Sequence, residues 1–98
     1  MTIEKKKNGE ELTVSITGRL DTSTAPELEA SVREELSGYK QLVLDFSNLE
    51  YLSSAGLRVI LSFQKIMNAH GTMVVRNVNE TIKEIFDITG FAEILTIE

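Results

Sequence analysis

The sequence predicts a single α/β domain with a mixed β-sheet, in which a parallel core and an N-terminal antiparallel hairpin are covered by helices. Three observations predict this fold class. The length of 98 residues leaves room for one hydrophobic core, so we expect one domain over residues 1–98. After residue 20, segments with strand character alternate with segments of helical period, which requires crossover connections between parallel strands. The dipeptide Asn8-Gly9 separates two strand-like segments, as in an antiparallel hairpin.

The hairpin is predicted over residues 3–7 and 11–17. Asn8-Gly9 is a strong hairpin signal because both residues tolerate the positive φ that tight turns require. In the second segment apolar residues alternate with Thr and Ser at the period of two expected for a half-buried strand. The apolar members are Leu12, Val14 and Ile16.

A first helix is predicted to begin near Ala25 and to end at Gly38, which stands where a C-cap glycine belongs. Thr24 is expected to cap its N-terminus, Pro26 suits the first turn, and Glu27 can complete a capping box. The apolar residues of this segment fall on one stripe, so we expect the helix to cover one face of the sheet. These residues are Leu28, Val32 and Leu36.

The remaining elements alternate between strand and helix. Residues 41–46, of sequence Q-L-V-L-D-F, predict a central strand that is buried on both faces. A largely buried helix is predicted over residues 57–68, followed by a second buried strand at residues 72–76. A third helix is expected within residues 79–90, between a capping Asn and a terminating Gly. A short terminal strand is expected at residues 94–97.

Charge and residue usage exclude several classes of function. Ten Lys and Arg against fifteen Asp and Glu give a formal net charge of -5, so neither nucleic acid nor an acidic membrane is an expected partner. The chain has no Cys and one His, so we expect no disulfide, no thiol nucleophile and no metal site. Nucleotide-binding glycine motifs are absent, and we expect no cofactor. Because the N-terminus has no apolar signal segment, a cytoplasmic location is expected.

Two adjacent serines, Ser53 and Ser54, precede the helix predicted over residues 57–68. One of them should cap this helix and hold its hydroxyl beside amide groups that have no intrahelical partner. A phosphoryl group there, with about -1.5 to -2 charge, would face the positive end of the helix dipole without unfolding the domain. Gly56 is expected to let another chain or a phosphate oxygen approach the first turn. Because paired serines are also ordinary capping residues, the pattern alone leaves both interpretations open.

Three segments carry a more specific pattern. They read G-R-L-D-T-S-T-A from residue 18, E-Y-L-S-S-A-G-L-R-V-I-L from residue 50, and N-E-T-I-K-E-I-F-D-I-T-G from residue 79. In this order they resemble the STAS family, the bacterial anti-sigma factor antagonists, and the similarity spans residues 3–97. The resemblance implies a STAS-type fold and a binding module rather than an enzyme.

The resemblance also implies a partner-switching role. Such a protein binds an anti-sigma factor that is a serine kinase, which frees a sigma factor, and phosphorylation on serine ends the binding. Ser54 matches the family's phosphorylated position, and Ser53, where many members have Asp, is the less favoured acceptor. A serine phosphatase is a further expected partner, and the domain is expected to be a monomer or a weak dimer. The residues expected to bind the partner are Asp21, Thr22, Ser53, Ala55, Gly56 and Arg58.

Several of these residues have a more specific expectation. Asp21 matches an acidic loop residue that lies near the phosphorylation loop in the family. Ala55 replaces a second serine found in some relatives, which leaves Ser54 as the less ambiguous acceptor. Arg58, one turn beyond Ser54, can steady a phosphate, contact a partner acid, or remain a solvated helix arginine. Relatives often carry a further C-terminal helix, whereas this sequence stops at Glu98.

Two other functions compete with this interpretation. In the first, the chain is a STAS module of another assembly, either a stress-signalling complex or a lipid-transporter subunit, and Ser54 is a contact that is never phosphorylated. The second is a small serine hydrolase, which is disfavoured because no G-x-S-x-G elbow surrounds the two serines.

Overall fold

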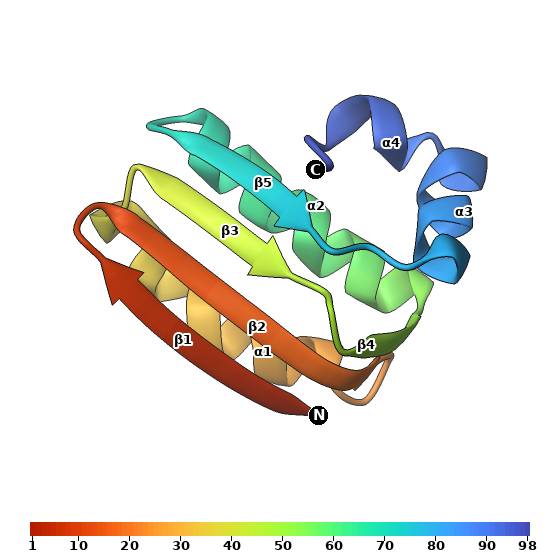
Figure 1. Cartoon of the computed structure of the whole chain (residues 1–98). Coiled ribbons are helices and arrows are strands. Elements are labelled where there is room, and N and C mark those ends of the chain that lie inside the picture. The colour runs from red at the N-terminus through yellow and green to blue at the C-terminus, as the bar shows by residue number, and fades with distance from the viewer.

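The computed structural model describes residues 1–98 and confirms the predicted α/β fold. Its strands are β1 (Thr2–Asn8), β2 (Glu11–Leu20), β3 (Gln41–Asp45), β4 (Leu49–Leu52) and β5 (Thr72–Arg76). Its helices are α1 (Ala25–Val32), the 3-10 helix η1 (Arg33–Gly38), α2 (Ser54–Asn68), α3 (Glu80–Thr89) and α4 (Phe91–Ile94). The main sheet has the order β1-β2-β3-β5, and β4 pairs with β2 (Figure 1). The pair β1 and β2 is antiparallel, and the other pairs are parallel.

The opening hairpin forms as predicted, with its turn one residue further along the chain. β1 and β2 stay in register up to the pair of Asn8 and Glu11. The two turn residues are therefore Gly9 and Glu10, and Gly9 supplies the positive φ of 61°. The hairpin leaves β1 at the sheet edge and places β2 where it can pair with both β3 and β4.

The first helix begins where it is predicted but ends and is capped differently. α1 gives way to the 3-10 helix η1, and Gly38 is not a left-handed C-cap, since η1 ends at the extended residue Tyr39. Thr24 occupies the predicted N-cap position of α1, but its side chain forms no capping hydrogen bond. Its Oγ1 accepts a hydrogen bond from the Asp21 N–H at 2.8 Å and donates to the Arg19 carbonyl oxygen at 2.8 Å. The hydroxyl thus closes the loop before the helix.

The centre of the sheet confirms one prediction and adds a strand. β3 lies between β2 and β5, and its three middle residues are buried, as predicted for a central strand. β4 is absent from the sequence-based prediction because its pattern breaks the strand period of two. Leu49 and Leu52 are buried, whereas Glu50 and Tyr51 between them are exposed. β4 leads directly into α2, which begins at Ser54, three residues before the predicted start.

The C-terminal third contains the predicted third helix but not the predicted terminal strand. Asn79 caps α3 by accepting the Ile82 N–H at 2.9 Å, and Gly90 ends α3 with a φ of 81°. That left-handed residue also starts the short helix α4, so residues 91–94 are helical. Only a single bridge, between Ile97 and Val75, joins the C-terminus to β5.

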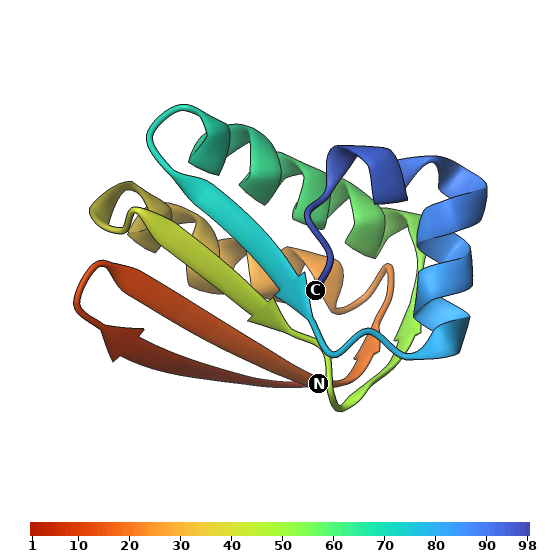
Figure 2. The ribbon, with the colours of Figure 1, turned by 45° about the horizontal axis from the view of Figure 1, so that its top comes forward.

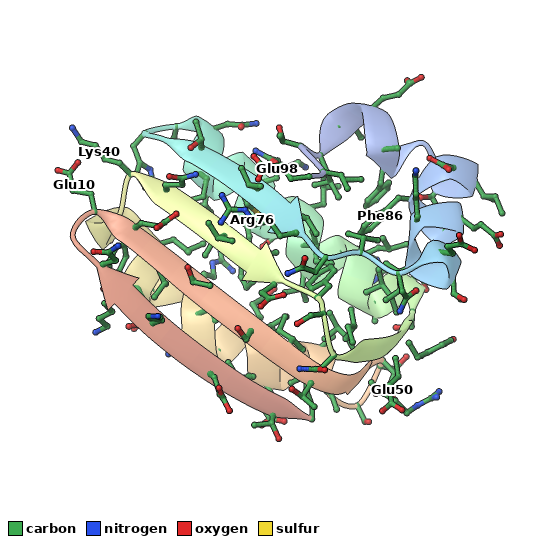
Figure 3. The ribbon with its side chains drawn as sticks, viewed as in Figure 1. Glu10, Lys40, Glu50, Arg76, Phe86 and Glu98 are labelled. Atoms are coloured by element: carbon green, nitrogen blue, oxygen red, sulfur yellow. The ribbon has the colours of Figure 1, made fainter.

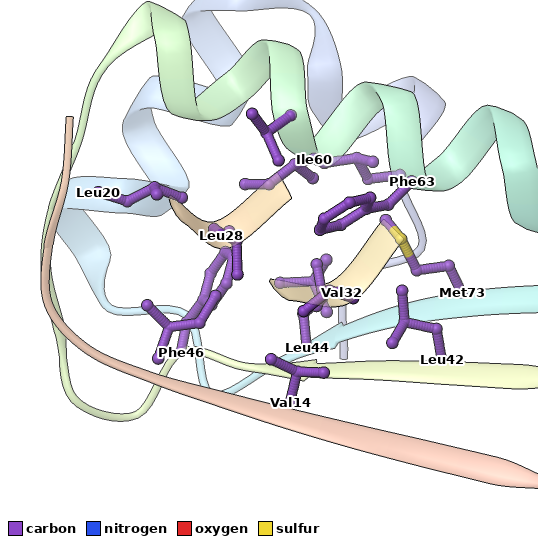
Figure 4. Packing of buried hydrophobic residues seen from close by; sticks show 14 of the residues in the cluster. Val14, Leu20, Leu28, Val32, Leu42, Leu44, Phe46, Ile60, Phe63 and Met73 are labelled. Atoms are coloured by element: carbon purple, nitrogen blue, oxygen red, sulfur yellow. The ribbon is translucent and has the colours of Figure 1, made fainter. Parts of the chain in front are cut away.

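The hydrophobic core lies between one face of the sheet and helices α1 and α2, and it extends to α3 through Ile82 and Phe86 (Figure 2). Twenty-three buried residues form one cluster. In Figure 4, Val14 and Leu44 from the sheet face Val32 of α1 and Phe63 of α2. The opposite face of the sheet has no helix over it (Figure 3). Arg76 and other polar residues lie there around two buried valines, Val43 and Val74. No helix is long and apolar enough to cross a bilayer.

Candidate functional site

The starts of α1 and α2 lie at the same end of the sheet, where β2 and β4 end (Figure 2). β2 runs into the loop that precedes α1, and β4 runs into α2. The Ser53 N–H donates to the Leu20 carbonyl oxygen at 2.9 Å, which ties the start of α2 to the end of β2. The N-termini of both helices therefore lie at this end of the molecule. The Ser54 and Ala55 amides of α2 have no hydrogen-bond partner, whereas in α1 the Ala25 N–H donates to the Asp21 carbonyl oxygen at 2.8 Å and Pro26 has no N–H.

The structure separates the roles of the two serines. Ser53 is the N-cap of α2, and its Oγ accepts a hydrogen bond from the Gly56 N–H at 3.3 Å. Ser54 is the first residue of α2 and is exposed. Its hydroxyl forms no hydrogen bond with the rest of the chain, whereas Ser53 is half-buried and committed to the cap. Of the two predicted acceptors, Ser54 is therefore the more exposed and the one whose hydroxyl is free.

Gly56 has an interior role, which corrects our expectation for it. The residue is buried, and a Cβ built on it would lie 2.7 Å from Leu52 Cδ1 and 2.8 Å from Leu20 Cγ. Both contacts are well inside van der Waals distance. The glycine therefore allows the first turn of α2 to pack on the ends of β2 and β4, and its missing side chain opens no path for a partner or a phosphate.

An open groove of about 350 Å³ runs between the first turns of α1 and α2. It brings together three of the residues expected to bind a partner, namely Thr22, Ala55 and Arg58. Arg58 is exposed and forms no ion pair. It lies four residues after Ser54, a spacing that places both side chains on one side of a helix. The other lining residues are Ala25, Pro26, Glu29 and Val59.

Asp21 holds the loop before α1 in shape. Its Oδ1 accepts hydrogen bonds from the Ser23 hydroxyl at 2.8 Å, from the Ser23 N–H at 3.0 Å and from the Thr24 N–H at 3.2 Å. The hydrogen bond from the Ser23 side chain is the main cause that lowers the pKa of Asp21. The carboxylate is thus ionised and largely satisfied within its own loop. This loop follows β2 directly and so lies beside the start of α2.

Two residues that the sequence did not indicate also lie at this end of the molecule. Arg19 of β2 is opposite Tyr51 of β4, and the guanidinium carbon lies 4.3 Å from the centroid of the Tyr51 ring. The two residues are 32 positions apart, and only the pairing of β2 with β4 brings them together. The one sign of these residues in the sequence is the position of Tyr51, two residues before the serine pair.

The protein is a small α/β domain with an open mixed sheet and two helices on one face of it. Its candidate site is formed by loops and by the N-termini of these helices. The chain belongs to the STAS domain family, whose profile matches residues 2–98. The family indicated by the three sequence segments is therefore confirmed.

Relatives of the chain are anti-sigma factor antagonists. An anti-sigma F factor antagonist of Paenibacillus polymyxa is 31% identical over 98 residues, which cover 97% of this chain and 84% of that protein. The anti-sigma-B factor antagonist of Bacillus subtilis is 27% identical over 96 residues, which cover 97% of this chain and 88% of that protein.

Solved structures show the same fold. An anti-sigma factor antagonist from Mycobacterium paratuberculosis is 23% identical and superposes with a TM-score of 0.89 over 98% of this chain and 83% of that chain. The antagonist SpoIIAA of Bacillus is 16% identical and has TM-scores of 0.80 in its unphosphorylated form and 0.79 in its phosphorylated form. Each superposition covers 99% of this chain, with 87% and 91% of the two SpoIIAA chains.

Proposed function

We propose that this domain is an anti-sigma factor antagonist that binds a serine-kinase anti-sigma factor through the surface around Ser54, and that phosphorylation of Ser54 ends the binding. The observation that carries this proposal is the exposed, unbonded hydroxyl of Ser54 at the first position of α2, beside the groove that Thr22, Ala55 and Arg58 line. The names of the relatives support the same class of partner.

The chemical step is a phosphoryl transfer. The Ser54 Oγ attacks the γ-phosphorus of ATP held by the kinase, ADP leaves, and the hydroxyl proton passes to a base of the kinase. A serine phosphatase reverses the modification by transferring the phosphoryl group to water. This chain contributes the acceptor and its position, and the partner holds the nucleotide.

The position of Ser54 explains how one phosphate can act as a switch. The added dianion lies at the N-terminus of α2, near free amides and the unpaired Arg58, so the domain can carry it without unfolding. Within an interface the same charge must lose its water or face partner acids. A cost of a few kcal/mol reduces affinity by about a hundredfold or more.

The direct test is phosphorylation by the serine-kinase anti-sigma factor of the same genome in the presence of ATP. We expect the intact mass to increase by one phosphate, and peptide mapping to place it on Ser54. Ser54→Ala should abolish the increase, and Ser53→Ala, the matched control at the adjacent hydroxyl, should retain it. Binding of the kinase without any phosphate transfer would instead favour a STAS module of another assembly, and a phosphate on Ser53 would move the acceptor.

A further inference from the structure

Arg19 and Tyr51 form a pair at the end of the molecule that also carries Ser54. The Arg19 guanidinium carbon lies 4.3 Å from the Tyr51 ring centroid, well within cation–π distance. Asp21 Oδ2 lies 3.8 Å from Arg19 Nε and adds an ion pair to the same guanidinium. The pair stands at the ends of β2 and β4, immediately before the start of α2.

A β-bulge in β4 creates the pair. Gly18 is opposite Leu49, but the next residue of β2, Arg19, is opposite Tyr51, so Glu50 is an extra residue with no partner in β2. Without this extra residue, the strand period of two would turn Tyr51 toward the core that Leu49 faces. The bulge instead brings Tyr51 to the surface beside Arg19. Bulges are frequent next to functional sites because they redirect side chains in this way.

The exposure of the pair suits a contact with another protein. Tyr51 is 39% exposed, and the side chain of Arg19 is 61% exposed. Tyr and Arg are enriched among the residues that dominate binding energy in interfaces. The other exposed large apolar side chains, Ile88 and Ile94, lie on α3 and α4.

Two arginines at this end of the molecule, Arg19 and Arg58, are incompletely paired. Arg58 has no ion pair, and Arg19 reaches Asp21 only through Nε at 3.8 Å, which leaves its terminal nitrogens free. A partner that pairs with them must present carboxylates, and one that covers Tyr51 must present an apolar side chain. A carboxylate placed against Arg58, one turn beyond Ser54, would also be repelled by a phosphate on Ser54, which fits release on phosphorylation.

We propose that Arg19 and Tyr51 form a second anchor of the anti-sigma factor interface, which the partner meets with a carboxylate against Arg19 and an apolar side chain against Tyr51. This inference rests on the proposed function and adds the residues and the partner chemistry that give the interface its selectivity. The bulge fixes both side chains before binding, so little conformational entropy is lost when the partner arrives.

The test measures the affinity of the unmodified full chain for the serine-kinase anti-sigma factor of its genome, by calorimetry. Arg19→Gln and Tyr51→Ala should each weaken binding by about tenfold, whereas Tyr51→Phe, which keeps the ring, should stay within about twofold. Lys40→Gln is the matched control for loss of a cation, because Lys40 is exposed and lies at the end of the sheet away from Glu50 (Figure 3). It should bind like the parent chain.

Two further measurements separate the possible outcomes. The difference in affinity between the parent chain and Arg19→Gln should be smaller at about 0.5 M salt than at about 0.05 M salt, because salt screens exposed ion pairs. Hydroxyl-radical footprinting of the parent chain, which needs no folded variant, should show protection of Tyr51 and not of Tyr39 on complex formation. Parent affinity in both variants, or an unprotected Tyr51, would overturn this inference and leave the proposed function intact. Failure of the parent chain to bind any such kinase would overturn both.

Discussion

The hydroxyl oxygen of Ser53 lies 3.3 Å from the backbone nitrogen of Gly56, and this contact makes Ser53 the N-cap of α2. The neighbouring Ser54 hydroxyl has no such bond. We therefore expect Ser53→Ala to lower the free energy of unfolding by about 1 kcal/mol. Ser54→Ala, the matched control, should change it by less than about 0.5 kcal/mol. Urea unfolding of both variants checks this, and equal losses would contradict the assignment of the cap.

The position of a negative charge should matter more than its presence. Ser54→Asp should abolish capture of the anti-sigma factor because it places a carboxylate inside the interface, and Ser54→Ala should keep it. Ser53→Asp adds the same charge one residue earlier, at a capping position that Asp suits. This variant should also still bind the anti-sigma factor. Pull-down with the purified kinase measures all three variants. Equal binding by Ser54→Asp and Ser54→Ala would remove the switch.

Gly56 should be intolerant of any side chain. A Cβ at this position would lie 2.7 Å from Leu52 Cδ1 and 2.8 Å from Leu20 Cγ, so Gly56→Ala should destabilise the domain by about 1–3 kcal/mol through overpacking. Gly38→Ala is the matched control, because nothing lies within 4 Å of its Cβ position. It should be neutral or slightly stabilising. Thermal unfolding compares them, and an unaffected Gly56→Ala would show that α2 can shift away from the strand ends.

The elements that the sequence predicts well are those with local signals. The opening hairpin follows from Asn8-Gly9, and α3 follows from a capping Asn79 and a left-handed Gly90, which act within a few residues of themselves. β4 escapes prediction because its bulge breaks the alternation of buried and exposed residues over only four positions. A single register shift of this kind has no signature in the sequence.

The sequence likewise predicts only part of the candidate site. The serine pair before α2 is visible in the sequence, but either serine can cap a helix, and only the fold assigns the cap to Ser53. Gly56 is visible too, while the side chains that its Cβ would strike come from elements distant in sequence. Arg19 and Tyr51 meet through strand pairing alone, so no local pattern connects them. Local sequence patterns therefore do not predict contacts between elements that are far apart in the chain.

The domain should lose stability in acid through three carboxylates whose pKa values lie below the ordinary range. In each case the main cause is a hydrogen bond to the carboxylate. Asp21 accepts it from the Ser23 hydroxyl, Glu35 from the Lys5 ammonium, and Asp45 from the Asn77 amide. A carboxyl with a lowered folded pKa contributes stability above its unfolded pKa of about 4 and loses it as the pH falls through the folded value. The free energy of unfolding should therefore decrease as the pH is lowered from about 4.

Asp45→Asn makes the acid prediction specific, because it removes one of the three titrations while the amide oxygen can still accept from Asn77. Its free energy of unfolding should fall less steeply than that of the parent chain between about pH 4 and pH 2.5. Urea unfolding at a series of pH values measures both proteins. Identical slopes would show that Asp45 titrates alike in the folded and unfolded chains.

Phosphorylation should leave the domain folded, and Arg58 should help to hold the phosphate. A dianion on the first residue of α2 interacts favourably with the helix dipole, by about 0.3–1 kcal/mol. An ion pair with Arg58, four residues on, adds about 0.2–0.5 kcal/mol, and salt screens this gain. The phosphorylated chain should therefore unfold at the same or a higher urea concentration than the unmodified chain. Arg58→Gln should reduce this gain but leave the unmodified chain unchanged, because Arg58 has no ion pair there. A phosphorylated chain that unfolds at lower urea concentration would mean that the modification acts by loosening α2 rather than by blocking the surface around Ser54.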